Sequence, residues 1–455
     1  MFLKAMYSSN INIRLTTLFV AIILCVFSVT YAQLVDDVPD DPTKIESRIS
    51  TLEEALKKKA DKPDSAKGFT AKLDGRIYFD SYHLSGDGRS ETPSFRNDLN
   101  YNGIKDLRIG VTGEGYRNYA YKLDLFLANG NTVEIRDVWL SVSDVPLLDS
   151  VKIGHHRVEE GISSLLPGMH TQFIFYDGAD FINFYRLGIS SRHLWAQKRI
   201  RFFAGVFEFK PVAQQFRNET DESVHWGAIA NTRLTYMPYI SKDKDGTIDG
   251  ERFMLFGINY GYYDVNSAAQ VFNVRYSQLF GSLQRIDIGN VSAYQQVGLE
   301  FAAQHGPLAA QSEAYIRTYN RTGANNDVTI WGTYLEGRIF LTGDFRRFNA
   351  DQAIWSGVTL KHNLEFIKKN DWNLAEHLGA WELAVKWSYT DVSDCGRVDF
   401  PGVCANRVHD FTVGLNWYWN ERTRAMFNYT RILPADKVGG HSGIDLFATS
   451  FRYYF

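Results

Sequence analysis

Long apolar runs are absent from this sequence outside its first 32 residues. A membrane-spanning helix needs roughly 20 consecutive apolar residues, so the rest of the chain offers none. Charge of one sign is also lacking, since the formal net charge of the 455 residues is only -3. Without a basic surplus, nucleic acid is not an expected partner. Proline is scarce, with 11 residues, whereas glycine reaches 36, which is typical of strands joined by turns.

Motifs of catalysis are missing as well. Gly-x-Ser-like stretches lack a strand-to-helix context, histidine pairs lack carboxylate partners at metal-binding spacing, and no glycine loop fits a phosphate. The neighbouring carboxylates Glu159 and Glu160 are interpreted as solvated loop residues. We therefore predict that the protein is not an enzyme and uses no metal or cofactor.

Cysteine is nearly absent, with three residues in all. Cys25 falls in the apolar N-terminal run, which leaves Cys395 and Cys404 close together in a stretch rich in turn residues. Such a pair fits a disulfide in an oxidising compartment, and two unlinked loop thiols are the alternative.

The first 32 residues have the pattern of a signal peptide. Lys4 and Arg14 precede the apolar run Leu18–Val29, and small residues occupy the last and third-last positions. An uncleaved anchor is the alternative, but the apolar core is short for a membrane span. We expect cleavage between Ala32 and Gln33, so that the mature protein leaves the cytoplasm.

Residues 33–67 form a separate segment, an acidic linker followed by a heptad pattern. Its apolar residues recur at spacings of four, three and four and are Ile45, Ile49, Leu52 and Leu56. A seam of about two heptads is marginal as a dimer in water, but three copies held together by a larger assembly could form a coiled coil. One amphipathic helix lying on its own domain is the alternative.

Alternation with a period of two governs residues 68–455. In Tyr119–Leu127 and Phe411–Trp419 one face is apolar and aromatic and the other is largely small or polar. The last stretch, Gly443–Phe455, ends on an aromatic face that something outside the chain must cover. A lipid bilayer would do so, and strands in lipid must pair at both edges because no water satisfies their backbone groups. The pattern therefore predicts an all-β transmembrane barrel.

About sixteen antiparallel strands are expected, an even number that returns the chain to the side where it began. They begin near residues 69, 104, 119, 133, 150, 184, 199, 224, 251, 292, 307, 328, 379, 409, 423 and 443. Tight turns near residues 115, 196, 305 and 420 alternate with long joins at 84–103, 158–183, 266–291 and 392–408. Residues 344–378 break this alternation. They either hold two further strands, for eighteen in all, or fold at the inner rim.

If the aromatic faces meet lipid, the opposite faces line a water-filled channel. The expected basic wall residues are Arg76, Arg108, Lys122, Lys152, Arg186, Arg192, Arg201, Arg233, Arg338, Lys386 and Arg452. The expected acidic wall residues are Asp74, Asp80, Asp124, Glu300, Glu313, Glu336 and Glu382. The basic surplus favours anions, whereas cross-strand pairing would make any one arginine part of the scaffold instead.

Residues 158–183 are the expected constriction. This segment is rich in turn residues and carries the apolar group Phe173–Tyr176, which needs a wall to pack on. A loop folded into the barrel would find such a wall. Basic residues in and beside the segment could make the pore sensitive to pH if they face the lumen, or could be solvated on a surface loop. These residues are His155, His156, Arg157 and His170.

An ordered set of stretches covers most of residues 69–455. They are Val151–His155, Thr232–Pro238, Gly298–Pro307, Ser312–Tyr315, Gly332–Asp344, Gly379–Val385, Gly414–Asn420 and the terminal strand. Together they resemble the phosphate-selective porin O and P family of outer-membrane channels. The resemblance implies a homotrimer of sixteen-stranded barrels, a loop folded into each pore and passive passage of anions. It also implies a periplasmic heptad helix and recognition of Phe455 by the outer-membrane assembly machinery.

The chain departs from the family in one respect. The Arg-x-Arg-x-Arg strand of the family's best-known members is not reproduced, because Arg186, Arg192 and Arg201 do not alternate strictly. We therefore predict an outer-membrane porin, set in outer-membrane lipid, that passes small hydrophilic solutes and favours small inorganic or organic anions. The alternative is a structural barrel that anchors to the periplasmic layer through its N-terminal helix.

Overall fold

The computed structural model describes residues 70–86, 98–116, 118–129, 132–175, 181–182, 185–209, 227–242, 246, 248–277, 281–323, 327–365, 377–394, 407–435 and 443–455. These residues belong to one compact unit, Phe69–Phe455. The expected signal peptide, the heptad helix, Cys395 and Cys404 lie outside the described residues. Within the described ranges, no helix has the length and apolarity to cross a membrane.

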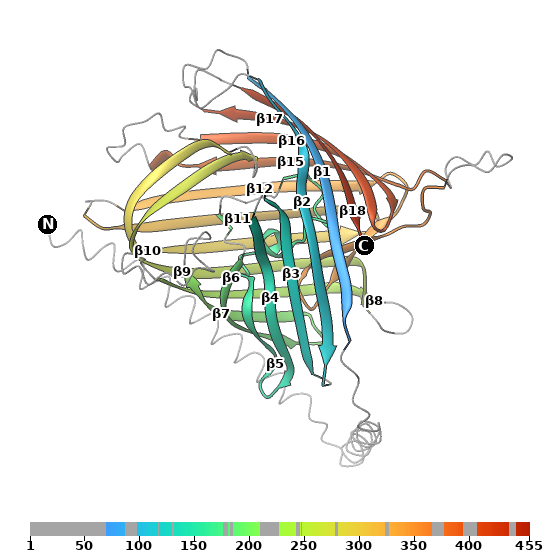
Figure 1. The fold of residues 1–455 in the computed structure, drawn as a ribbon, viewed down its shortest axis with the longest axis horizontal. Helices are drawn as coiled ribbons and strands as arrows, with labels where there is room; N and C mark the ends of the chain where they lie inside the picture. Colours follow the sequence, from blue (N-terminus) through green and yellow to red (C-terminus); the bar gives the residue numbers. More distant parts are fainter. Residues whose placement is uncertain are drawn as a thin grey trace. The chain divides into compact units, whose positions relative to one another are not determined.

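Sixteen antiparallel strands close into a barrel (Figure 1), which confirms the expected fold and number. They are β1 (Lys72–Gly86), β2 (Asp98–Gly115), β3 (Tyr119–Asn129), β4 (Thr132–Val145), β5 (Leu148–Arg157), β6 (Tyr185–Trp195), β7 (Ile200–Phe209), β8 (Gly227–Lys242), β9 (Ile248–Ser277), β10 (Gly281–His305), β11 (Leu308–Arg321), β12 (Val328–Phe340), β15 (Ala380–Asp391), β16 (Arg407–Asn420), β17 (Thr423–Pro434) and β18 (Ile444–Tyr454). The last strand pairs with the first, with Arg76 opposite Tyr454, so the terminal aromatic strand closes the barrel.

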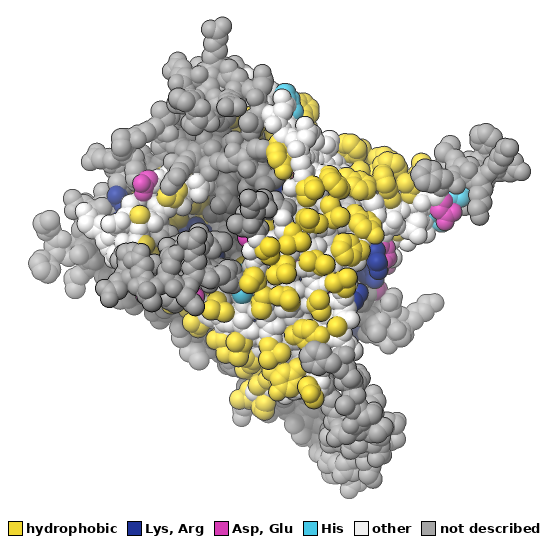
Figure 2. Space-filling view, viewed as in Figure 1, with side chains coloured by type: hydrophobic (Ala, Val, Ile, Leu, Met, Phe, Trp, Pro, Cys, Tyr) yellow, Lys and Arg dark blue, Asp and Glu magenta, His cyan; other side chains and the backbone are white. Residues whose placement is uncertain are grey.

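Alternating burial shows which face of each strand points inward. In β12 every second residue is buried, including Glu336 and Arg338, while Leu335 and Ile339 between and beside them are exposed. Figure 2 shows such exposed apolar side chains spread over the wall formed by β1–β5. A charged interior inside an apolar wall is the arrangement that a lipid bilayer stabilises.

A hairpin lies between β12 and β15 in the sequence. It consists of β13 (Phe345–Asn349) and β14 (Ile354–Thr359), which pair with each other and stand outside the sixteen-stranded order. Trp355 of β14 is fully buried, and the guanidinium carbon of Arg338 lies 3.7 Å from its ring centroid. Residues 344–378 thus contain two further strands, but these lie inside the barrel and leave the number of wall strands at sixteen.

Two of the expected long joins contain strand at both of their ends, which corrects the sequence interpretation. β1 extends to Gly86 and β2 begins at Asp98, and only residues 278–280 separate β9 from β10. The turn-forming residues Asn266 and Ser267 have left-handed φ values of 49° and 61° and lie at a register shift. They bend the hairpin instead of ending the strand, because a bulge adds residues to one strand without breaking the ladder.

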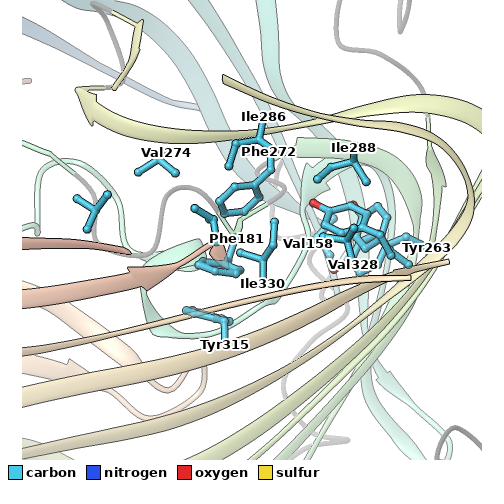
Figure 3. Close-up of a cluster of buried hydrophobic side chains, with 14 of the residues drawn as sticks. Val158, Phe181, Tyr263, Phe272, Val274, Ile286, Ile288, Tyr315, Val328 and Ile330 are labelled. Atoms are coloured by element: carbon cyan, nitrogen blue, oxygen red, sulfur yellow. The ribbon is translucent and has the colours of Figure 1, made fainter. Parts of the chain in front are cut away.

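The bent extension of β9 and β10 packs on the segment that follows β5. Phe272 and Ile286 of the extension share a buried apolar cluster with Val158 and Phe181 (Figure 3). The rings of Phe181 and Phe272 are 5.3 Å apart between centroids. The extension therefore buries its apolar face against protein inside the barrel mouth, and its pattern reflects that contact instead of lipid.

Candidate functional site

Residues 158–175, called here the inserted loop, lie inside the barrel and are held by its far wall. Arg424 of β17 donates a hydrogen bond of 2.9 Å to the carbonyl of Gly168. Arg452 of β18 donates to the same carbonyl and to that of Ile174, the latter at 3.2 Å. Because a buried carbonyl without a partner is costly, these two arginines determine the course of the loop.

A single helical turn, α3 (Ile162–Leu165), brings the inserted loop against β11 and β12. The carboxylate of Glu313 accepts hydrogen bonds from the backbone amide of Ile162 at 2.6 Å and from that of Ser163 at 3.2 Å. The hydroxyl groups of Ser163 and Tyr334 are also hydrogen-bonded, at 2.8 Å. The loop is thus attached to both sides of the barrel, and the space beside it is confined.

Glu159 and Glu160 are buried, so their interpretation as solvated loop residues is wrong. Glu159 forms an ion pair with Arg201 at 2.6 Å and lies 3.6 Å from Arg233. Glu160 accepts a hydrogen bond from the hydroxyl of Tyr263. Burial alone would raise the pKa of Glu159, but the two guanidinium groups hold that pKa below its ordinary value. Both carboxylates therefore anchor the loop, through partners far away in the sequence.

A cavity of about 360 Å³ remains open between the inserted loop and the wall of β1–β7. Its basic lining residues are Arg76, Arg108, Lys122, Lys152, Arg157, Arg192 and Arg201. Its acidic lining residues are Asp124, Asp137 and Glu159. Seven basic against three acidic side chains leave an excess of four positive charges. In a space enclosed by protein, such an excess attracts anions more strongly than it would in open water.

Several of the lining bases are balanced by neighbouring acids. Arg76 lies 2.8 Å from Asp106, and Lys122 lies 3.6 Å from Asp137. Pairs of this kind across adjacent strands stabilise the wall. These ion pairs therefore weaken the attraction that an anion in the cavity feels toward Arg76 and Lys122.

Lys152 and Arg192 differ from the paired bases. Neither lies within 4.0 Å of a carboxylate in the described ranges of the chain. Lys152 is opposite Ser190, two positions along β6 from Arg192, so the two charges sit on adjacent strands. The Lys152 ammonium lies 4.3 Å from the ring centroid of Trp139. These two side chains supply positive charge to the cavity without a direct ion pair to a described acid.

The predicted basic wall residues fall into two groups. Those that line the cavity are Arg76, Arg108, Lys122, Lys152, Arg192 and Arg201. Those that face inward but contact inserted segments or neighbouring wall residues are Arg186, Arg233, Arg338, Lys386 and Arg452. Six of the eleven predicted residues thus lie where a channel-lining role is expected, and five lie where a scaffold role is expected.

At least three inward arginines were missed by sequence reasoning, and one of them, Arg317 of β11, donates to the carbonyl of Phe181 at 2.7 Å. Arg424 alternates with Met426 and Asn428 on the inner face of β17, so the period of two could have identified it. Arg346 lies in β13 and forms a fully buried ion pair with Glu382 at 2.8 Å. No sequence signal pointed to Arg346, because the hairpin that carries it leaves the wall.

The basic residues expected at the constriction lie at the end of β5 and in the inserted loop. His155 and His156 are both buried, and the ring of His156 contacts the Ser190 hydroxyl at 2.8 Å. His156 and Arg157 line the cavity. None of these three is a solvated residue of a surface loop.

His170 occupies the middle of the inserted loop. Its carbonyl accepts a hydrogen bond from Arg346 of the hairpin. Loss of water around the ring, together with the charges of Arg346 and Arg424, lowers the pKa of His170 to about 3. The imidazole is therefore neutral at physiological pH and adds no charge to the lumen.

A closed sixteen-stranded barrel with an apolar outer wall, a charged interior and an inserted loop defines a channel-forming outer-membrane protein. In the part of the chain described, no cluster of His, Cys, Asp and Glu could hold a metal ion. The family model of the phosphate-selective porins O and P matches residues 72–432. The chain belongs to this family and is an outer-membrane channel protein for small solutes.

Solved structures of bacterial porins share the fold. The anion-selective porin of Comamonas acidovorans is 12% identical, with a TM-score of 0.51 over 85% of this chain and 100% of that chain. OprB of Pseudomonas putida at high pH is 10% identical, with a TM-score of 0.50 over 86% and 94%. The outer-membrane channel DcaP of Acinetobacter baumannii is 10% identical, with a TM-score of 0.50 over 85% and 98%. A comparison with curated proteins found no match.

Proposed function

We propose that this channel allows passive diffusion of small hydrophilic solutes and prefers anions, phosphate-like anions among them. The observation that supports this is the basic lining of the cavity beside β1–β7, in which Lys152 and Arg192 form no ion pair within 4.0 Å with a carboxylate of the described residues. An anion that enters a narrow, protein-lined space is attracted by such charges, and a cation is repelled. The inserted loop directs solutes to this side of the barrel.

Reversal potentials in planar bilayers test the proposal. Under a gradient of potassium chloride, the purified protein should give a potential of the sign set by chloride, and potassium phosphate should give the same sign. A potential near zero or of the opposite sign would overturn the anion preference. Conductance near zero in both salts would instead support a structural barrel.

We also propose an assembly for the whole chain. Residues 1–32 are a signal peptide cleaved before Gln33, residues 33–67 form a periplasmic linker and coiled-coil helix, and residues 68–455 form the barrel of a homotrimer. The heptad pattern supports the helix, and the apolar outer wall supports contact with outer-membrane lipid. N-terminal sequencing of the purified protein tests the cleavage. Deletion of residues 43–62 should leave the barrel folded and lower the temperature at which the trimer dissociates on gels.

The terminal residue, Phe455, supports a proposed interaction with a further partner. Phe455 exchanges two backbone hydrogen bonds of 3.1 Å with Gly75, and its side chain is 40% exposed. The outer-membrane assembly machinery is the proposed reader of this aromatic terminus. Removal of Phe455 should lower the amount of assembled protein in the outer membrane. A disulfide between Cys395 and Cys404 remains a prediction.

A further inference from the structure

The tip of the β13–β14 hairpin, residues 350–353, lies between two cavities. Gln352 lines the cavity beside β1–β7. Asp351 lines a second cavity of about 660 Å³, together with Lys198 of the β6–β7 turn. Gln197 of the same tight turn also lines this second cavity. The hairpin tip therefore stands between the first cavity and the tight β6–β7 turn.

The stem of the hairpin is fixed by packing. Trp355 is fully buried, its ring centroid 4.8 Å from that of Phe253 and its other face against Arg338. Arg346 and Glu382 form their ion pair with no exposure of either side chain. Breaking a buried pair of this kind is costly. Any displacement of the hairpin is thus confined to its tip.

The tip itself is held by basic side chains that bind its backbone carbonyls. Arg201 donates to the carbonyl of Asp351 at 2.8 Å, and Arg192 donates to the same carbonyl at 3.3 Å. Arg233 donates to the carbonyl of Gln352 at 3.1 Å. Arg192 and Arg201 are the same donors that line the first cavity. An anion in that cavity therefore competes with the tip for them.

The side chain of Asp351 faces the opposite cavity. Its carboxylate lies 2.7 Å from the ammonium of Lys198, and the two side chains are 40% and 49% exposed. An ion pair this exposed to water is weak. The carboxylate places a negative charge, only partly balanced, in the lining of the second cavity.

We propose that the hairpin tip is the exit barrier of the channel and that Asp351 and Lys198 are its specificity-determining residues. The proposal rests on the anion-preferring channel and adds a second selective step to it. Attraction to Lys198 and repulsion from Asp351 both scale with the charge of the permeant. The balance between these two side chains therefore sets how readily divalent anions leave relative to monovalent ones.

The test compares Asp351→Asn with the matched variant Asp149→Asn in planar bilayers. Asp149 is 41% exposed, lies beside His193 at 3.7 Å and lines neither cavity. Loss of one screened charge at the exit should raise the chloride current of Asp351→Asn about twofold and raise the sulfate current further. Asp149→Asn should match the wild type. Lys198→Gln should lower both currents, with the larger loss for sulfate.

If the chloride current is the same in the wild type, Asp351→Asn and Lys198→Gln, and the sulfate current is also the same in all three, the exit barrier is overturned. The wild-type reversal potential reports separately on anion preference, so failure of the barrier and failure of the channel proposal can be distinguished. Heat-modified migration on gels shows that each variant is folded. Lys198→Gln, which leaves the hairpin sequence intact, keeps the proposal testable if Asp351→Asn does not assemble.

Discussion

Basic side chains serve two purposes inside this barrel. Arg424 and Arg452 are buried and bind carbonyl groups of the inserted loop. Lys152 and Arg192 line the open cavity without an ion pair within 4.0 Å to a carboxylate of the described residues. Charges of the second kind face a passing ion directly, whereas those of the first kind are buried and do not line the cavity. The position of a base relative to the loop therefore matters more than the number of bases.

Replacement of Lys152 and Arg192 by glutamine should lower the ratio of anion to cation permeability about threefold, since two charges without a direct ion pair leave the lining. Reversal potentials in a chloride gradient measure this ratio. Arg186→Gln is the matched control, because Arg186 faces inward but is not a cavity-lining residue. An equal effect of the control, or an unchanged ratio in the double variant, would contradict the assignment.

Acid stability depends on His170 in a direction set by its low pKa. In an unfolded chain this imidazole binds a proton near pH 6.5, but in the folded protein it does so only near pH 3. The contribution of His170 to the free energy of unfolding is therefore complete above about pH 6.5 and is lost as the pH falls toward 3. The thermal midpoint should fall over this range, and less steeply in His170→Gln. Circular dichroism in detergent gives both profiles, and parallel curves would contradict the prediction.

At the level of elements, the period of two was enough to predict the wall. Strands such as β12 place apolar residues on the outer face and charged residues inside, and this alternation is present in the sequence. The inserted segments could not be predicted in the same way. Asn428 of β17 accepts a hydrogen bond from the amide of Ile174, 254 residues earlier. Local pattern reports which face of a strand meets lipid, but not which distant segment covers the other face.

The course of the inserted loop should depend on the last strand. Arg452→Met removes the donor for the carbonyls of Gly168 and Ile174, which costs about 1–3 kcal/mol per buried group left without a partner. Faster amide exchange in the loop and more frequent current fluctuations are the expected results. Arg431→Met, which breaks a part-exposed pair with Asp445 at 2.6 Å, is the control. Identical exchange in both variants would refute the anchoring role.

The whole molecule closes where its described ends meet. Gly75 of β1 and the terminal Phe455 exchange backbone hydrogen bonds. A Cβ atom at Gly75 would approach the ring of Phe455 to 2.2 Å and the carbonyl of Arg108 to 2.8 Å. A larger residue at this position would therefore displace the terminal ring or the adjoining backbone, a constraint that depends on strand register and was not evident from the strand's own pattern.

Gly75→Val should weaken the closed barrel because its side chain displaces the terminal ring and the adjoining backbone. A lower temperature for the conversion of folded to unfolded bands on gels is the expected result. Gly337→Val is the control, since a Cβ atom there meets its nearest neighbours only at 4.0 Å. Similar melting of the two variants would show that the contact at the seam is unimportant.

The attachment of the inserted loop to the last two strands also constrains the order of folding. Gly168 is separated by 256 residues from Arg424 and by 284 residues from Arg452. Contacts over such separations form late, because the entropy of closing the intervening chain must be overcome first. The cavity beside the inserted loop is therefore among the last parts of the protein to acquire its shape during biogenesis. A nascent barrel in which β18 has not yet paired with β1 has no fixed inserted loop. Selectivity therefore appears only when the wall is complete.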